Sequence, residues 1–274
     1  MAYLAREGLK HRTIKAYLSG IRCMQIHLSM GNPFGNGAMP RLEYVLTGIK
    51  RVESRSGVTH RRRMPITMDI MCRLRGVWLT PAADPDKVML WAAACTGFFG
   101  FLRAGEFSVP SAQAYDPQGH LNLADISVDS HATPSMVCLQ IKQSKTDPFR
   151  QGVEVFLGRT YAAVCPVEAI IGYIAVRASS PGPLFVLQSG TPLTRSYLVT
   201  ELQSALRILG LEDSQFNGHS FRIGAATTAA MQGLEDSLIQ TLGRWKSEAY
   251  RTYIRIPRNE LAEVSRVLAQ GVRS

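Results

Sequence analysis

The sequence predicts an α+β fold that is mostly helical and carries one small antiparallel sheet. Apolar residues recur at helical spacing through most of the 274 residues, and three consecutive β signals interrupt them, at His120–Val128, Met136–Ile141 and Gly152–Leu157. With 46% hydrophobic and 19% charged residues, the composition is that of a globular protein. It excludes a disordered chain and a fibre.

Residues 1–58 predict a small helical domain. Between Leu9 and Leu28, one helical face collects Ile14, Tyr17, Leu18, Ile21, Met24 and Leu28. A second helix is predicted over Pro40–Val52, where the proline suits a first turn. Residues 59–66 lack an apolar period and hold the triplet Arg61, Arg62 and Arg63. They predict a basic linker. It would either bind along a polyanion or be only a solvated hinge or a localisation signal.

The positive charge of the chain is concentrated near its start. The net charge is +10, with a pI of about 9.6, and residues 1–63 hold 12 basic and three acidic residues. Such a surface suits a polyanion, although a charged helix face is often only solvated. The candidate DNA-binding residues are Lys10, Arg12, Lys15, Lys50, Arg51, Arg61, Arg62 and Arg63.

Residues 67–274 predict a larger domain in which helices surround the three strands. The polar stretch between the second and third strands, KQSKTDPFRQ, predicts a hairpin turn. The predicted helices are Thr67–Trp78, Asp84–Thr96, Pro166–Arg177, Thr194–Leu209, His219–Gln232, Asp236–Gly243, Ser247–Tyr253 and Arg258–Leu268.

Several classes of protein are disfavoured. The five cysteines form no close pair, so neither a disulfide framework nor a CxxC metal site is indicated. The longest apolar stretch, Val88–Leu102, is too short to span a bilayer, and no signal peptide follows Met1. We expect a soluble intracellular protein that needs no metal or cofactor.

Two polar islands, by which we mean charged residues within an otherwise apolar stretch of sequence, lie in the middle of the chain. Arg103 and Glu106 stand three residues apart inside an aromatic run, where an ion pair across one helical turn is the ordinary explanation. Lys142 and Lys145 lie at the predicted hairpin tip. Exposed hairpin lysines are usually only solubilising, so neither island points to a chemistry alone.

Two further islands lie near the end of the chain. His219 and Arg222 share a face at the start of a helix, where the helix dipole favours an anion such as phosphate. A capping histidine with a surface arginine is the alternative. The stretch LGRWKSEAYRTYIR then offers Arg244, Trp245 and Tyr253, together with Tyr250, which is interpreted as a core residue.

In this order and spacing, the four islands resemble the tyrosine recombinase (phage integrase) superfamily. The sequence GHSFRIGAATTAA, followed by LGRWKSEAYRTYIR, is similar to the corresponding sequences in recombinases of eukaryotic DIRS-type retrotransposons. The resemblance implies a SAM-like helical core-binding domain and a catalytic domain that together hold double-stranded DNA. The segment before Arg63 is shorter than such a core-binding domain, so we expect it to be truncated.

The resemblance also implies a role for each residue. Tyr253 would attack the scissile phosphate and form a 3′-phosphotyrosine link, without metal or ATP. Arg103 and Arg222 would bind the non-bridging oxygens, Lys145 would protonate the leaving oxygen, and His219 would take the tyrosine proton. Glu106 would orient its neighbours. Trp245 is preferred over Arg244 for a further phosphate-binding position, although Arg244 lies at the family's usual spacing, nine residues before Tyr253.

Members of the family act as tetramers on two DNA sites, so a homotetramer on DNA is expected, with a monomer possible off DNA. Arg258–Leu268 would either pass to a neighbouring protomer or fold back on its own domain. A type IB topoisomerase-like enzyme and a domesticated, non-catalytic DNA-binding protein are the rival functions. An origin in a transposable element, and a nuclear location in a eukaryotic host, are further expectations.

Overall fold

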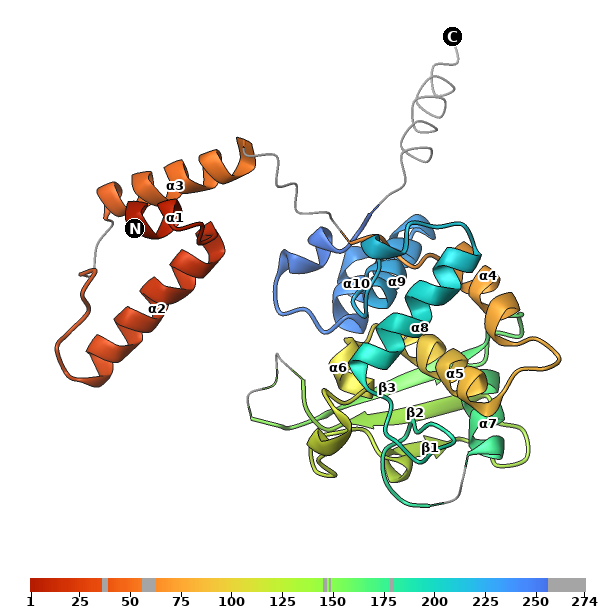
Figure 1. Cartoon of the computed structure of the whole chain (residues 1–274). Coiled ribbons are helices and arrows are strands. Elements are labelled where there is room, and N and C mark those ends of the chain that lie inside the picture. The colour runs from red at the N-terminus through yellow and green to blue at the C-terminus, as the bar shows by residue number, and fades with distance from the viewer. Residues whose placement is uncertain (36–38, 56–62, 145–146, 148, 178–179, 256–274) are drawn as a thin grey trace, which may run out of the picture. The chain divides into compact units, whose positions relative to one another are not determined.

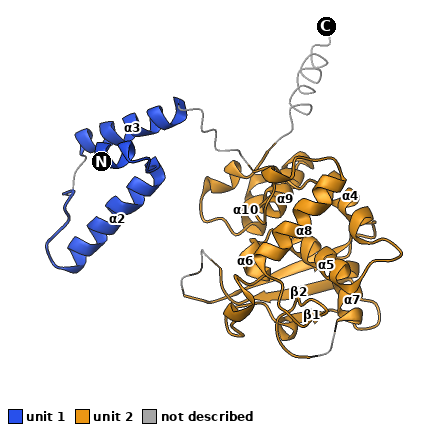
Figure 2. Cartoon of the chain, viewed as in Figure 1, with its two compact units in different colours: residues 1–61 blue, residues 62–274 orange. Residues whose placement is uncertain are grey.

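A computed structural model describes residues 1–35, 39–55, 63–144, 147, 149–177 and 180–255 (Figure 1). The chain divides into two compact units, residues 1–61 and 62–274 (Figure 2). This boundary falls inside the range 59–66 that was proposed as a linker, of which residues 59–62 lie outside the described part.

Unit 1 consists of three helices, α1 (Ala2–Arg6), α2 (His11–His27) and α3 (Pro40–Arg55). The main-chain N–H of His11 donates to Glu53 Oε2 at 3.1 Å, which joins the start of α2 to α3. Of the predicted apolar face of α2, only Ile14 is buried; Tyr17, Ile21, Met24 and Leu28 are exposed in this unit. The helix is therefore confirmed, and most of its apolar face is on the surface of unit 1.

The sheet of unit 2 has three antiparallel strands in the order β1 (Ile126–Val128), β2 (Met136–Ile141) and β3 (Val153–Gly158). Alternate residues of β2 and β3 are buried, as the period of two predicts. The first strand was predicted to begin at His120, and this was wrong. Residues Leu123–Asp125 form a 3₁₀ turn instead, closed by the hydrogen bond from the Asn122 N–H to Asp125 Oδ2.

Helices surround this sheet. They are α4 (Met68–Trp78), α5 (Pro85–Phe99), α6 (Ala104–Phe107), α7 (Pro166–Val176), α8 (Arg195–Ile208), α9 (Ser220–Met231) and α10 (Asp236–Leu242). Their predicted positions are confirmed apart from α6, which was not predicted. The predicted helix Ser247–Tyr253 is a 3₁₀ helix, Glu248–Thr252. The predicted helix Arg258–Leu268 lies outside the described residues.

Helix α5 forms the centre of unit 2. The Asp84 side chain accepts from the Lys87 N–H and Pro85 occupies the first turn, so the helix starts where the sequence predicts. Every residue from Met89 to Phe98 is buried, and α5 packs against α4, α7 and α9. Because α5 is enclosed on all sides, the segment that follows it is held rigidly beside α9. No helix in the described residues is long and apolar enough to cross a membrane.

Candidate active site

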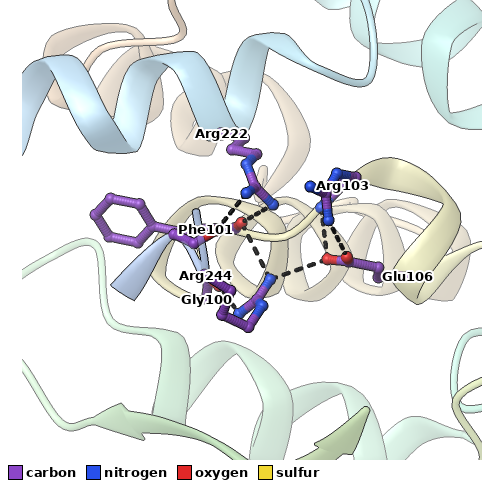
Figure 3. Close-up of polar contacts among 7 residues, drawn as sticks. Gly100, Phe101, Arg103, Glu106, Arg222 and Arg244 are labelled. Atoms are coloured by element: carbon purple, nitrogen blue, oxygen red, sulfur yellow. Dashed lines mark hydrogen bonds and ion pairs between the residues drawn. The ribbon is translucent and has the colours of Figure 1, made fainter. Parts of the chain in front are cut away.

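Three segments that are distant in sequence bring three arginines and one glutamate together (Figure 3). Arg103 and Glu106 come from the start of α6, Arg222 from α9, and Arg244 from the residue that follows the C-cap of α10. Glu106 links two of the arginines. One of its oxygens accepts from Arg103 Nη1 at 2.8 Å, and the other accepts from Arg244 Nη2 at 3.0 Å.

The carboxylate of Glu106 also accepts from the main-chain N–H of Arg103, at 2.9 Å, so the glutamate caps α6 as well. Its side chain is only 4% exposed. A carboxylate this deeply buried needs charged partners, and the two guanidiniums supply them. The predicted Arg103–Glu106 pair is therefore present, and its glutamate also holds Arg244.

Arg222 is fully buried. Its Nη1 donates to the main-chain oxygen of Phe101 at 3.0 Å, and its Nη2 donates to the main-chain oxygen of Gly243. The guanidinium carbon lies 4.4 Å from the ring centre of Trp245 and 5.8 Å from that of Tyr253. Two aromatic rings therefore lie within cation–π distance of this guanidinium.

Two helix ends shape this cluster. Both α5 and α10 end in a Schellman motif, with Leu102 N–H bonded to Gly97 and Trp245 N–H bonded to Gln240. The left-handed position of such a motif usually holds glycine, but here it holds Phe101 (φ +50°) and Arg244 (φ +54°). A non-glycine residue in this conformation costs about 1–3 kcal/mol, and such strain is often found at functional sites.

This geometry directs the Phe101 carbonyl and the Arg244 side chain toward each other. The Phe101 oxygen accepts from Arg244 Nη2 at 3.4 Å as well as from Arg222, and Arg244 Nη1 donates to the Gly100 oxygen at 3.2 Å. One carbonyl oxygen therefore holds two guanidiniums together, although like charges repel.

Two glycines allow the close packing around the site. A Cβ on Gly243 would lie 1.6 Å from Cζ3 of Trp245, so only glycine lets the indole ring lie where it covers Arg222. A Cβ on Gly218 would lie 2.5 Å from the Cβ of Ala104. Gly218 thus lets the start of α9 approach α6, which brings Arg222 close to Arg103 and Glu106.

The cluster has an excess of positive charge. Three guanidiniums surround one carboxylate, giving a local charge of +2. Burial, with a smaller contribution from Arg103, lowers the pKa of Arg222 to about 10. Burial also lowers the pKa of Arg244, opposed by the neighbouring Glu106. Because guanidinium groups stay protonated in proteins, the site favours an anion that can balance the charge.

Buried hydrogen-bond donors lead to the same conclusion. Among the described residues, Nε of Arg222, Nε of Arg244 and Nε1 of Trp245 have no acceptor, and each is buried. An unsatisfied buried donor costs about 1–3 kcal/mol. A ligand with several closely spaced anionic oxygens would satisfy these donors and the excess charge together, and a phosphate group has both properties.

The remaining predicted site residues lie at the edge of this cluster or outside the described part. His219 is half-buried at the N-cap of α9, one turn before Arg222, and its main-chain N–H donates to Asn217 Oδ1 at 2.9 Å. Tyr253 is half-buried, with its ring 5.0 Å from that of Trp245. Lys145 lies outside the described residues. Its neighbour Lys142 is bound to Asp125 at 2.8 Å.

The structure also distinguishes the two tyrosines. Tyr250 is only 3% exposed as a residue. Its hydroxyl donates to Asp236 Oδ2 at 2.8 Å and so fixes the 3₁₀ helix to α10. This confirms the interpretation of Tyr250 as a core residue. The main-chain oxygen of Tyr253 accepts from Thr227 of α9 at 3.3 Å, so its backbone is held beside the helix that carries Arg222.

The predicted DNA-binding residues are on the surface wherever the structure describes them. Lys10, Arg12, Lys15, Lys50 and Arg51 are exposed in unit 1. Arg63 is exposed in unit 2, where its Nη1 donates to the Ser214 oxygen at 2.8 Å. Arg61 and Arg62 lie outside the described residues.

The sequence did not reveal the Phe101 carbonyl or the role of Gly243. The sequence carries no signal for them, because glycine is the residue expected in the left-handed position, whereas Gly100 and Gly243 are right-handed and the residues after them, Phe101 and Arg244, take the positive φ. Within the described residues, no group of three or more histidine, cysteine, aspartate or glutamate side chains could hold a metal ion.

No family model matches the chain. An integrase/recombinase xerD homolog from Selenomonas ruminantium is 24% identical over 213 residues, which are 74% of this chain and 57% of the relative. The chain thus spans little more than half the length of that relative.

Two solved structures share the fold. The XerA recombinase aligns over 97% of this chain and 84% of its own, with a TM-score of 0.55 and 14% identity. The XerH site-specific recombinase, in a post-cleavage complex with palindromic difH substrate, aligns over 76% of this chain and 54% of its own, with a TM-score of 0.54 and 16% identity. The chain thus has the fold of the tyrosine recombinase (integrase) superfamily and resembles it in sequence.

Proposed function

We propose that this protein is a site-specific DNA recombinase that cleaves and rejoins DNA through a 3′-phosphotyrosine intermediate. The observation that carries the proposal is the buried cluster of charge +2, with unsatisfied donors, beside Tyr253. Such a cluster matches the reacting phosphate of DNA better than a neutral ligand. The reaction needs neither ATP nor a metal, because the phosphotyrosine bond retains the free energy of the phosphodiester.

In the first step, the Tyr253 oxygen attacks the scissile phosphorus while the bond to the 5′ oxygen breaks. His219 receives the tyrosine proton, and Lys145 gives a proton to the 5′ oxygen, which leaves as a hydroxyl. In the second step, the 5′ hydroxyl of a partner strand attacks the phosphotyrosine, and the proton transfers run in reverse. The number of phosphodiester bonds is unchanged.

The charge of the cluster explains why the step would be fast. A phosphodiester carries one negative charge, and attack by a tyrosinate gives a transition state with two. A site of charge +2 therefore balances the transition state better than the ground state, which is the condition for catalysis. Arg103 and Arg222 each have a planar fork of donors that suits the non-bridging oxygens.

Arg222 cannot reach DNA in the conformation described here, because it is fully buried beneath Trp245 and Tyr253. Cleavage therefore follows a movement of the segment that carries these two rings. Such a movement would expose the Arg222 donors and release the tyrosine hydroxyl for attack.

Double-stranded DNA is the proposed partner, gripped in part by the exposed basic residues of unit 1. Assembly as a tetramer on two sites would place two scissile phosphates from each duplex within one complex. The amino-acid sequence around His219 and Tyr253 favours an origin in a DIRS-type transposable element. In a eukaryotic host, the reaction would then take place in the nucleus.

The proposal is tested with a suicide substrate. The full chain is incubated with a pool of duplexes of random sequence that carry a nick, so that the short cleaved fragment diffuses away and the covalent adduct accumulates. Wild type is expected to form an adduct stable to denaturation, and Tyr253→Phe is expected to form none. Tyr250→Phe is the matched control and should retain the adduct, since its hydroxyl is bound to Asp236.

No adduct from wild type, with DNA still bound, would show a non-catalytic DNA-binding protein instead. An adduct accompanied by relaxation of supercoiled DNA, without strand exchange between two recovered sites, would show a topoisomerase-like reaction. Exchange of strands between two sites supports the recombinase.

A further inference from the structure

Arg244 is in a conformation that the fold does not require of an arginine. It occupies the left-handed position that ends α10, at φ +54°, where glycine would be free of strain. The side chain is also mostly buried, with 15% of its surface exposed, close to two other guanidiniums. Both the backbone strain and the like-charge repulsion act against arginine at this position.

The contacts of Arg244 leave part of its guanidinium available. Nη1 donates to the Gly100 oxygen, and Nη2 donates to Glu106 and the Phe101 oxygen. The buried Nε has no acceptor among the described residues. Glu106 holds Arg103 in the same way, so Arg103 and Arg244 lie on the two oxygens of one carboxylate.

Trp245 has a different environment. Its ring lies against the Arg222 guanidinium and the Tyr253 ring, at 4.4 Å and 5.0 Å. Its buried Nε1 also has no acceptor among the described residues, so the two residues do not differ in this respect. Trp245 has no hydrogen bond to Glu106, whereas Arg244 is bound to Glu106 and shares the Phe101 oxygen with Arg222. Of the two neighbours, Arg244 is therefore the one bonded into the arginine cluster.

We propose that Arg244 is a third phosphate-binding arginine of this site, and that Trp245 acts as the cover of Arg222. This inference rests on the proposed function, because it assigns the reacting phosphate to the cluster. Glu106 keeps Arg103 and Arg244 aligned before substrate arrives. When phosphate enters, the donors of Arg244 that the protein does not use bind its oxygens.

A purely structural role for Arg244 makes a different prediction. If the residue only supports Glu106 and the two carbonyls, its removal should destabilise the fold and leave phosphate binding to Arg103 and Arg222. If it binds phosphate, Arg244→Gly should relieve the backbone strain yet lose the anion. The two roles therefore separate when stability and phosphate binding are measured together.

The first experiment uses the full chain with inorganic phosphate as the probe. Melting temperatures are recorded as phosphate replaces chloride at constant ionic strength. Wild type is expected to melt at a higher temperature in phosphate. Arg244→Gly is expected to lose most of this phosphate-induced rise, whatever its melting temperature in chloride. Tyr161→Gly is the matched control, because Tyr161 has φ +53° and is 82% exposed; it should keep the full rise.

The second experiment applies if Arg244→Gly proves unstable. The rate of adduct formation is compared, within each protein, on a phosphodiester and on a methylphosphonate, which lacks the charge of one non-bridging oxygen. Folding losses cancel in this ratio. If Arg244 neutralises that charge, the variant should lose about 100-fold in rate on the phosphodiester and much less on the methylphosphonate.

A full phosphate-induced rise in Arg244→Gly, or an unchanged rate ratio, would overturn the inference. These outcomes differ from a failure of the proposed function. That failure appears as the absence of a Tyr253-dependent adduct in wild type, whereas the phosphate-induced rise in melting temperature is measured without any cleavage.

Discussion

The guanidinium of Arg222 lies 4.4 Å from the centre of the Trp245 ring, and this contact closes the arginine cluster. The two residues come from α9 and from the segment after α10, so the contact fixes one segment against the other. Because the indole covers a cation that has to reach DNA, it connects the stability of the free protein with access to its site. Changes that move the ring should alter both.

Gly243→Ala is the simplest way to move the ring. The new Cβ would lie 1.6 Å from Cζ3 and 2.0 Å from Cε3 of Trp245, so the indole has to shift away from Arg222. We expect a loss of about 1–3 kcal/mol in the free energy of unfolding, as for other overpacked sites. Denaturant unfolding measures it, and stronger acrylamide quenching of tryptophan fluorescence would report the displaced ring.

Gly76→Ala is the control for this substitution. Gly76 lies inside α4, and a Cβ there meets no atom within 4 Å, so alanine should stabilise the protein by about 0.5–1 kcal/mol. An unfolding free energy for Gly243→Ala equal to that of wild type would contradict the close packing of Gly243 and Trp245.

Glu106→Gln removes the carboxylate that holds Arg103 and Arg244. The local charge then rises from +2 to +3, with the guanidiniums still buried. We expect a loss of about 3 kcal/mol, as when one partner of a buried ion pair is removed. Phosphate should restore part of this stability, because it can replace the missing negative charge. Thermal unfolding with and without phosphate measures both effects.

The matched control for Glu106→Gln is Glu168→Gln. Glu168 pairs with Arg159 at 3.0 Å, but its side chain is 55% exposed, so its loss should cost less than about 1 kcal/mol and should not respond to phosphate. Equal losses in the free energy of unfolding for the two variants would show that the burial of Glu106 does not increase its contribution to stability.

The fold followed from the sequence where a periodic pattern coincided with a start signal. Asp84 and Pro85 begin α5, and the apolar residues that follow at helical spacing predict a helix there. The short apolar run Met136–Ile141 and the alternation in Gly152–Leu157 likewise predicted β2 and β3. The first strand failed because Asn122 and Asp125 close a turn through their side chains, which a pattern of hydrophobicity does not register.

The site was less accessible from the sequence. Residue types and spacing identified Arg103, Glu106 and Arg222, which the structure brings together. They favoured Trp245 over Arg244 for a further phosphate-binding position, because they do not register the left-handed backbone at Arg244, which turns its side chain toward Glu106. The exposed face of α2 was also beyond prediction, since a period of 3.6 shows that a face is apolar and not what covers it.

The exposed basic residues of α2 give a prediction about DNA affinity. If Lys10, Arg12 and Lys15 each contact one phosphate, replacing all three with alanine should reduce the slope of log K against log salt by about 2.7, at 0.9 for each contact. Filter binding at a series of salt concentrations measures the slope. Arg207→Ala, which removes an exposed arginine paired with Asp213, is the control and should leave the slope unchanged. An unchanged slope in the triple variant would exclude these residues from the interface.

The last prediction concerns the loop between β2 and β3. Asp147 Oδ2 accepts from the Gly152 N–H at 2.9 Å, and this hydrogen bond lowers the pKa of the Asp147 carboxyl below its usual value of 3.8. A carboxyl with a lowered pKa in the folded state stabilises the protein above its unfolded pKa, and the effect is lost as the pH falls through the folded pKa. The loop contact should therefore persist at every pH above about 4 and weaken only in stronger acid.

Amide hydrogen exchange should show a protected Gly152 N–H at neutral pH. Asp147→Ala should remove the protection and slow adduct formation, because Lys145 lies two residues earlier in the sequence. Asp147→Asn should retain part of both through its amide oxygen. Equal exchange rates at Gly152 in wild type and Asp147→Ala would show that the carboxylate does not hold the loop.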